Sequence, residues 1–303
     1  MAKLEDQAGI FIERLHRQYW QSIAIDGAPV AKERSAFQEI EIFDSPQNGR
    51  VLALDRIVQL TSRDECAYSE MLAHVPIFEH GEAKTVLIVG GGDCCIAEEV
   101  LKHKGLELCE LAEIDARVVE LSRLHFKESN GAAFGDPRFK INIVDAAEFL
   151  RDPKAAGRYD VIISDRPDPV GPAGVLFEES FYRSVSRALS PRGIAVFQTG
   201  VPHYQPDELV TDQVELAKAF KHTGVLLTVV PTYVGGYMAL SWASNGHVLG
   251  APEAIARARA AFPKAGFSTD YYTPEIHAAA FALPAWVARI VAKANRQAKS
   301  APR

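Results

Sequence analysis

The stretch TVLIVGGGDCC, which spans Thr85–Cys95, decides the fold class of this chain. Its first part, TVLIV, is a continuous apolar run of the kind found in parallel strands buried on both faces. Gly90, Gly91 and Gly92 follow, and glycines at the carboxyl end of a strand let the backbone approach a ligand closely. The stretch therefore predicts the first strand of a doubly wound sheet with a ligand site at its end. A plain tight turn between strand and helix is the alternative explanation of the glycines.

Similar apolar runs follow along the chain, and they occupy residues 108–114, 139–144, 159–164, 193–198, 225–230 and 238–242. Segments with helical spacing lie between most of them, for example 96–102, 116–126 and 206–223. This alternation predicts an α/β fold with a doubly wound, Rossmann-like (methyltransferase-like) sheet that is mainly parallel. The Ala-rich residues 251–303 are expected to be mainly helical, with an interruption at 270–274.

The sequence before residue 84 shows a different pattern of secondary-structure signals. Short β-like runs at 37–43, 50–55 and 57–61 are separated by turns, and Asn48-Gly49 between the first two is a strong hairpin signal. A helix is expected over 64–78. We therefore predict an N-terminal β-rich domain, antiparallel and small, over residues 1–80. A Rossmann-like catalytic domain with a C-terminal helical tail is predicted over residues 81–303.

The composition is that of an ordinary globular protein: 303 residues, 48% of them hydrophobic, which excludes a disordered or collagen-like chain. No apolar run approaches the ~20 residues that a membrane-spanning helix needs, and charges interrupt the N-terminus as no signal peptide would. Four cysteines are too few for a disulfide framework, so a cytoplasmic location is expected. The net charge of −6 argues weakly against nucleic acid and weakly for a cationic ligand.

Acidic residues follow several of the predicted parallel strands. Glu113 ends the second strand, close to the spacing of about 20 residues at which an acid accepts hydrogen bonds from ribose hydroxyls. Asp145 ends the third strand, where it could face an adenine amino group or cap the next helix. With the glycine turn, these acids suggest a small molecule that contains adenosine. No metal-ligand spacing links the histidines or cysteines, so no metal cofactor is expected.

Asp165 and Asp168 follow the fourth strand in the segment ISDRPDPVGPAG, which is too rich in proline and glycine to be helical. Two carboxylates near a nucleotide site suit a cationic ligand or the removal of a proton, whereas Asp-Pro pairs are also common in turns. Tyr68 and Tyr233 could flank this pocket, although tyrosines in such contexts more often serve packing.

In order along the chain, FQEIEIF, VLIVGGGD, EIDARVVELS, DVIISDRPDPVGPAGVLF, PTYVGGYMALSWAS and YYTPEIHAAAFALP resemble motifs of the polyamine aminopropyltransferases, most closely bacterial spermidine synthases. The resemblance covers nearly the whole chain. It implies transfer of the aminopropyl group of decarboxylated S-adenosylmethionine to an amine, usually putrescine, with release of methylthioadenosine. It also implies small-molecule substrates, no organic or metal cofactor, and a homodimer formed through the sheet-rich N-terminal region.

The resemblance also implies site residues. The predicted donor-binding residues are Gln38, Ser69, Gly90, Asp93, Glu113, Asp145 (at the adenine), Ala146 and Pro172 (in the methylthioadenosine pocket). On the acceptor side, Asp165 matches the proton acceptor and Asp168 the residue that anchors the far ammonium of the diamine. Tyr68 and Tyr233 match residues that orient the attacking amine. A primary amine has a pKa near ~10.4, so its positioning and deprotonation by a carboxylate agree with this assignment.

Several residues depart from the family pattern. Cys94 and Cys95 replace small residues after Asp93, Ser69 replaces a histidine, and Ala146 replaces a glycine. Arg166 places a cation between the two acids. Its side chain is expected to point to solvent; pointing inward, it would pair with Asp165 or Asp168.

Three other functions remain open at this stage. One is aminopropyl transfer to another amine, such as 1,3-diaminopropane, cadaverine or spermidine. A second is an amine N-methyltransferase that uses S-adenosylmethionine. A third is a non-catalytic sensor of polyamines or nucleosides.

Overall fold

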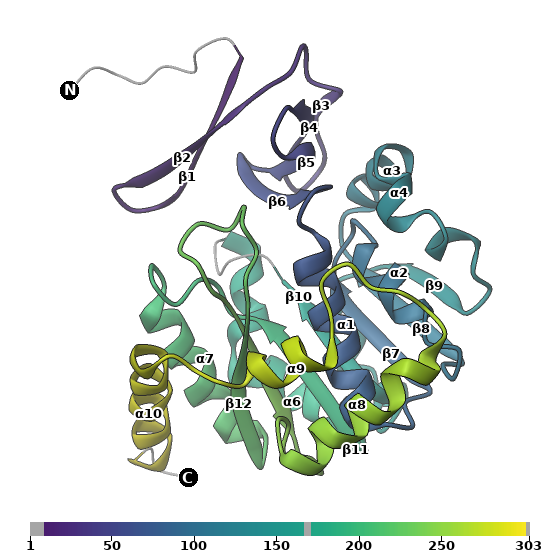
Figure 1. The fold of residues 1–303 in the computed structure, drawn as a ribbon, viewed down its shortest axis with the longest axis vertical. Coiled ribbons are helices and arrows are strands. Elements are labelled where there is room, and N and C mark those ends of the chain that lie inside the picture. The colour runs from purple at the N-terminus through teal and green to yellow at the C-terminus, as the bar shows by residue number, and fades with distance from the viewer. Residues whose placement is uncertain (1–8, 167–170, 301–303) are drawn as a thin grey trace.

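The computed structural model describes residues 9–166 and 171–300, and the side chains of residues 171–173 lie outside the description. Figure 1 shows a large α/β body with smaller β-sheets packed over one end of it. The predicted fold class is confirmed.

The core is a seven-stranded sheet with the order β12-β13-β11-β10-β7-β8-β9. Its strands are β7 (Thr85–Gly90), β8 (Leu108–Glu113), β9 (Phe139–Ile143), β10 (Tyr159–Asp165), β11 (Leu189–Gln198), β12 (His222–Thr228) and β13 (Met238–Ser244). The pairs from β9 through β11 are parallel, whereas β13 runs antiparallel to both β11 and β12. The sheet is thus mainly parallel, as predicted, with an antiparallel strand next to one edge.

Strand β7 explains why the central strands are apolar at every position. Val86 and Ile88 pack into the core on one face of the sheet, and Leu87 and Val89 pack into the core on the other. Because successive strand residues point to opposite faces, a strand covered on both sides needs an apolar residue at each position.

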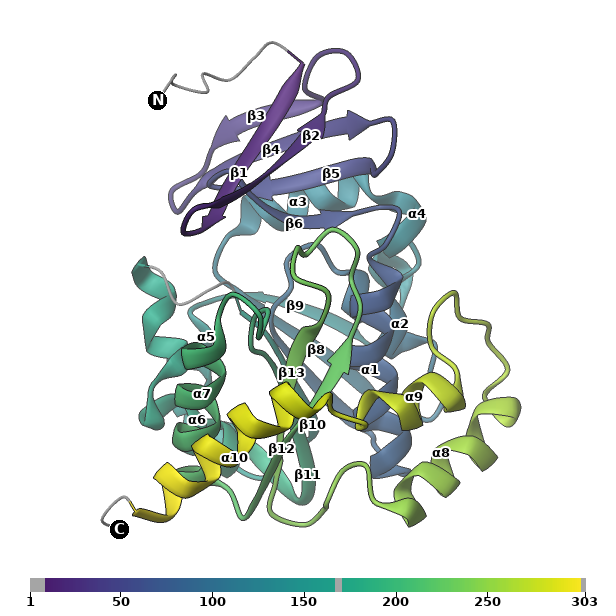
Figure 2. The ribbon, with the colours of Figure 1, turned by 60° about the vertical axis from the view of Figure 1, so that its left-hand side comes forward.

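Helices cover both faces of this sheet (Figure 2). They are α1 (Cys66–His80), α2 (Cys95–Leu101), α3 (Ala116–His125), α4 (Lys127–Asn130), α5 (Ala146–Arg151), α6 (Glu179–Ala188), α7 (Pro206–Ala219), α8 (Pro252–Ala265), α9 (Pro274–Ala280) and α10 (Ala285–Ser300). Short 3-10 turns are η1 (Ala133–Gly135), η2 (Pro153–Ala155) and η3 (Gly171–Phe177). The last three α-helices form the predicted C-terminal tail, with its interruption between α8 and α9.

No single described helix has the length and apolar character to cross a membrane, although the bent pair α9 and α10 passes on those two criteria.

Four antiparallel strands form the N-terminal sheet: β3 (Ala31–Arg34), β4 (Glu39–Ser45), β5 (Gly49–Leu54) and β6 (Ile57–Thr61). The predicted hairpin lies between β4 and β5, where Gly49 has a φ of 68° and pairs with Ser45. One face of the sheet packs on α3 through residues such as Ile42 and Leu121. This packing fixes the sheet above the carboxyl ends of the core strands.

A separate hairpin, β1 (Ile10–His16) and β2 (Tyr19–Ala24), was not predicted from the sequence. Phe11 and Ile23 pack against Phe43 and Val51 of the four-stranded sheet. Figure 2 shows the hairpin crossing that sheet and pointing its turn toward the core domain. The hairpin thereby carries side chains toward the carboxyl ends of the core strands.

Candidate active site

The carboxyl ends of four neighbouring core strands bring the predicted acids into one row. Because the strands lie in the order β10-β7-β8-β9, Asp165, the Gly90 turn, Glu113 and Asp145 follow one another along the edge of the sheet. Ligands of doubly wound sheets bind at this edge. The row spans the ends of four neighbouring strands, so two parts of a substrate could bind along it side by side.

Glycine is needed in the turn after β7 because the chain passes close to Asp165 and Glu113 there. Gly90 has a φ of 74°, and a Cβ there would lie 2.1 Å from the carbonyl oxygen of Asp165. A Cβ on Gly92 would lie 3.2 Å from the carboxyl carbon of Glu113. The turn is thus more than a simple connection, because a side chain at Gly90 would displace the backbone of Asp165 and one at Gly92 would press on the Glu113 carboxyl group.

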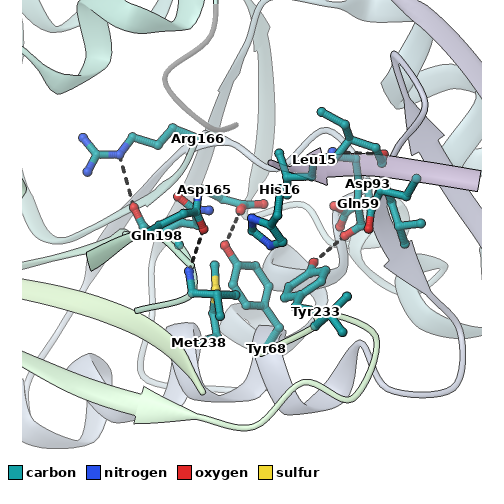
Figure 3. Close-up of a pocket in the computed structure, with 17 residues that line it drawn as sticks. Leu15, His16, Gln59, Tyr68, Asp93, Asp165, Arg166, Gln198, Tyr233 and Met238 are labelled. Carbon is teal, nitrogen blue, oxygen red and sulfur yellow. Dashed lines mark hydrogen bonds between the residues drawn. The ribbon is translucent and has the colours of Figure 1, made fainter. Parts of the chain in front are cut away.

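A pocket at the β10 end of the row contains four of the predicted site residues, Asp165, Asp93, Tyr68 and Tyr233 (Figure 3). The Tyr68 hydroxyl donates a hydrogen bond of 2.6 Å to Oδ1 of Asp165. The Tyr68 and Tyr233 rings meet edge to face, with centroids 5.7 Å apart, and the Tyr233 hydroxyl donates to the carbonyl oxygen of Gln59 at 2.5 Å. Both tyrosines therefore form the wall beside the Asp165 carboxylate.

The electrostatics of this pocket favour a cation. Burial, with the nearby Asp93 carboxylate, raises the pKa of Asp165 to about 7, and burial also raises the pKa of Asp93. Burial, then the Asp165 charge, raises the pKa of Tyr68 well above its usual value, so the phenol remains a donor. A bound cation would stabilise the ionised carboxylates and lower their pKa values.

Glu113 lies deeper in the row, and burial raises its pKa to about 7. Its Oε1 accepts a hydrogen bond of 2.8 Å from the backbone N–H of Asp115. The Asp115 carboxylate in turn accepts bonds from Gln38 Nε2 at 3.0 Å and from Ser35 Oγ at 2.6 Å. Gln38 thus reaches the Glu113 region from the N-terminal sheet by way of Asp115.

Asp145 caps helix α5, since its Oδ1 accepts from the backbone N–H groups of Ala147 at 2.7 Å and Glu148 at 3.2 Å. The helix-cap interpretation is therefore confirmed for Asp145, which is half-buried, and its contact with adenine stays a prediction. Ala146 is the buried first residue of α5.

Ser69 is buried on helix α1 and is not among the residues that line the pocket. Asp168 lies outside the described residues. Pro172 belongs to η3, and its side chain is outside the description as well.

The structure adds pocket residues that the sequence did not reveal, and the N-terminal hairpin supplies three of them, Glu13, Leu15 and His16. Glu13 and His16 of β1 line the pocket, where Glu13 Oε1 accepts from the backbone N–H of Val58 at 2.8 Å. The His16 ring stacks on Tyr204 at 4.5 Å. The sequence signal was weak, because Phe11 and Ile12 of β1 are both buried, so β1 lacks the regular alternation of a half-buried strand.

The expectation that Arg166 points to solvent is wrong: the side chain points inward but does not pair with Asp165, while Asp168 lies outside the described residues. The Arg166 guanidinium is only 1% exposed and pairs with Asp212 of α7. In Figure 3 it extends away from Asp165. Arg166 thus contributes to the lining of the pocket, while its guanidinium is paired with Asp212 and not with the pocket acids.

Among the described residues, no group of three or more His, Cys, Asp or Glu side chains is arranged to hold a metal ion.

Comparison with known proteins identifies the family. The model of the spermine/spermidine synthase domain matches residues 65–249, and that of the spermidine synthase tetramerisation domain matches residues 13–62. The polyamine aminopropyltransferase of Serratia proteamaculans is 41% identical over 281 residues, which cover 93% of this chain and 96% of that protein. The enzyme of the same name from a Ruegeria species is 43% identical over 278 residues, covering 92% and 96%.

Solved structures similar to this chain are also members of this family. A crystal structure of spermidine synthase in complex with the transition-state analogue AdoDATO superposes with a TM-score of 0.87 at 34% identity, covering 96% of this chain and 99% of that one. Spermidine synthase from Thermotoga maritima gives 0.86 at 34% identity, covering 93% and 94%. The chain therefore belongs to the spermine/spermidine synthase family, the polyamine aminopropyltransferases, as its motifs predicted.

Proposed function

We propose that this protein transfers the aminopropyl group of decarboxylated S-adenosylmethionine to putrescine, giving spermidine and methylthioadenosine. The observation that carries the proposal is the Asp165 carboxylate, hydrogen-bonded by Tyr68 at the end of β10 and beside the glycine turn. A carboxylate there borders both the acidic pocket and the row of acids that suits an adenosine-containing donor.

In the proposed reaction, the amine nitrogen attacks the aminopropyl carbon bonded to the sulfonium. A C–N bond forms, the C–S bond breaks, and its electron pair neutralises the sulfur, so the leaving group needs no metal. The nitrogen must lose a proton, and Asp165 accepts it through a carboxylate oxygen. Tyr68 engages Oδ1, so Oδ2 remains available on the side of Gly91, where a Cβ would lie 3.3 Å away.

Substrate charge explains why the pocket is acidic. An amine with a pKa near ~10.4 arrives protonated, and the donor carries a sulfonium and an ammonium. Asp93 and Glu13 add negative charge at the pocket wall, where they would face these cations. Alignment of nitrogen, carbon and sulfur is then the main remaining contribution of the protein.

We assign the donor to the rest of the row. Glu113 is proposed to accept hydrogen bonds from the ribose hydroxyls, and Asp145 to contact adenine beside the start of α5. Asp93 is proposed to hold the donor's aminopropyl ammonium. Gln38 would act by holding Asp115 next to Glu113, since its amide donates to that carboxylate.

We also propose that the protein forms an oligomer, a homodimer at least, through its N-terminal strands. The family model that matches residues 13–62 carries the description of a tetramerisation domain. Trp20 of β2 is 48% exposed, an apolar surface suited to such a contact. Light scattering on a size-exclusion column measures the oligomer, and a monomer at micromolar concentration would contradict this proposal.

The test of the function is incubation with decarboxylated S-adenosylmethionine and a panel of amines, with products identified by mass. We expect spermidine and methylthioadenosine in equal amounts, with putrescine giving the highest kcat/KM. A better acceptor among 1,3-diaminopropane, cadaverine and spermidine would correct the acceptor only. Ligand binding without any product would indicate a sensor, and methyl transfer from S-adenosylmethionine would indicate the other enzyme class.

A further inference from the structure

Arg166, directly after Asp165, is buried within a dense set of contacts. Its Nη1 donates to the Tyr182 hydroxyl at 2.8 Å and to the carbonyl oxygen of Leu176, and its Nε donates to the carbonyl oxygen of Gln198 at 3.3 Å. The guanidinium carbon lies 3.7 Å from the centroid of the Phe177 ring. One side chain that follows β10 directly thus joins three further elements, β11, η3 and α6.

Asp212 of α7 neutralises this buried charge. It pairs with Arg166, accepts from the Tyr182 hydroxyl, and accepts from Thr199 Oγ1 at 3.3 Å. Asp212 and Arg166 are each almost fully buried. A buried ion pair of this kind gives little net stability relative to apolar packing, but it can specify one arrangement of the elements it joins.

The arrangement it specifies lies at one wall of the pocket. Gln198, whose carbonyl is held by Arg166, lines the pocket, as does the neighbouring Gly200. Asp165 lies at the end of the neighbouring strand β10 and has supports of its own, because it pairs with Gly90 of β7 and receives the Tyr68 hydrogen bond. The pairing of Gln198 with Leu240 of β13 keeps β11 in the sheet, so loss of the Arg166 contacts should separate the end of β11 from η3 and leave Asp165 in place.

We propose that Arg166 is a positioning residue that sets acceptor binding by fixing the ends of β11 and η3 to each other. This inference rests on the proposed function, because it assigns the β11 wall to the acceptor amine. The role needs a guanidinium, whose planar fork reaches several acceptors at once, and a lysine ammonium cannot reproduce that geometry.

The test uses the double variant Arg166→Met/Asp212→Leu, in which apolar groups replace the ion pair without leaving a buried charge. We expect it to fold with a Tm near that of the unchanged protein. Its KM for putrescine should rise about tenfold while kcat changes by less than about threefold, the pattern of lost substrate binding. The Kd for methylthioadenosine should not change. Arg166→Lys, which keeps the charge opposite Asp212, should raise the KM as well.

Arg138→Met is the matched control. Arg138 pairs with Asp136 and donates to the carbonyl oxygens of Leu101 and His103, but it precedes β9 at the end of the sheet opposite the pocket. Its loss should lower the Tm and leave the KM for putrescine unchanged. An unchanged KM in the double variant, or equal weakening of putrescine and methylthioadenosine, would overturn the proposal. Failure of the proposed function would instead appear as absence of product in the unchanged protein.

Discussion

Tyr68 donates a 2.6 Å hydrogen bond to Asp165 across 97 residues of sequence, from helix α1 to the end of strand β10. The bond holds one carboxylate oxygen and leaves the other facing the glycine turn. It also opposes the effect of burial on the pKa of Asp165, since a hydrogen bond to the ionised form stabilises that form.

Substitution Tyr68→Phe should therefore reduce turnover and shift its pH dependence. The pKa of Asp165 should rise when the hydrogen bond is lost, and kcat should fall by roughly 10-fold, less than the ~100- to 10,000-fold of a full general-base contribution because Asp165 itself remains. Tyr233→Phe is the comparison, because its hydroxyl binds the carbonyl oxygen of Gln59 and not the carboxylate. Equal effects of the two variants on the pH profile would contradict the assigned role of the Tyr68 bond.

Activity should depend on pH through Asp165. Since the pKa of Asp165 is about 7 before substrates bind, kcat/KM for the amine should increase as pH rises through about 7. In Tyr68→Phe this midpoint should move to higher pH. Steady-state rates at low concentrations of both substrates, between pH 5.5 and 9, check the prediction because they report the protein before substrates bind. A profile without a step near pH 7 would count against Asp165 as the acceptor.

Stability should depend on pH in the opposite direction. The pKa of Glu113 is raised from 4.5 to about 7 in the folded state, so the folded protein binds this proton more tightly than the unfolded chain. The resulting stability is fully present below pH 4.5 and is lost as pH rises through about 7. The free energy of unfolding should therefore fall by on the order of 1–3 kcal/mol as the pH rises through this range.

Thermal unfolding of Glu113→Gln measures this effect, because the amide cannot ionise. Relative to the unchanged protein, the variant should gain stability between pH 5 and pH 8. Exposed Glu148, changed to Gln, should show no such difference. A parallel pH dependence in all three proteins would mean that Glu113 is not the origin of the effect.

The preference of the pocket for short over long amine acceptors should depend on His16. Its ring stacks on Tyr204 and lines the pocket, so His16→Ala opens space beside Glu13. We expect the ratio of kcat/KM for spermidine to that for putrescine to rise by roughly tenfold, the effect of about 1.4 kcal/mol. His203→Ala, which removes a ring packed on another side of Tyr204, serves as control. The measurement is kcat/KM for both amines. An unchanged ratio in His16→Ala, or the same rise in His203→Ala, would contradict a role of His16 in acceptor length.

Local patterns predicted the central part of the fold well. The apolar run and glycines of Thr85–Gly92 identified β7 and its turn, because a strand buried on both faces has a distinctive composition. The positions of Asp165, Tyr68 and Tyr233 followed from motifs, and the structure brings all three into one pocket.

The missed features depend on contacts between distant segments. Strand β1 lacks regular alternation, because β1 packs on the N-terminal sheet and also borders the pocket through Glu13. The orientation of Arg166 depends on Asp212, 46 residues later on α7, and on the Phe177 ring. Neither partner has a spacing or motif that links it to Arg166 in the sequence.

The most direct test of proton transfer to Asp165 is product formation by Asp165→Asn. With decarboxylated S-adenosylmethionine and putrescine, the variant should form spermidine at least about 100-fold more slowly than the unchanged protein. It should still bind methylthioadenosine with a Kd close to that of the unchanged protein, which shows an intact donor site. Spermidine formation at the unchanged rate by Asp165→Asn would contradict the mechanism proposed for this pocket.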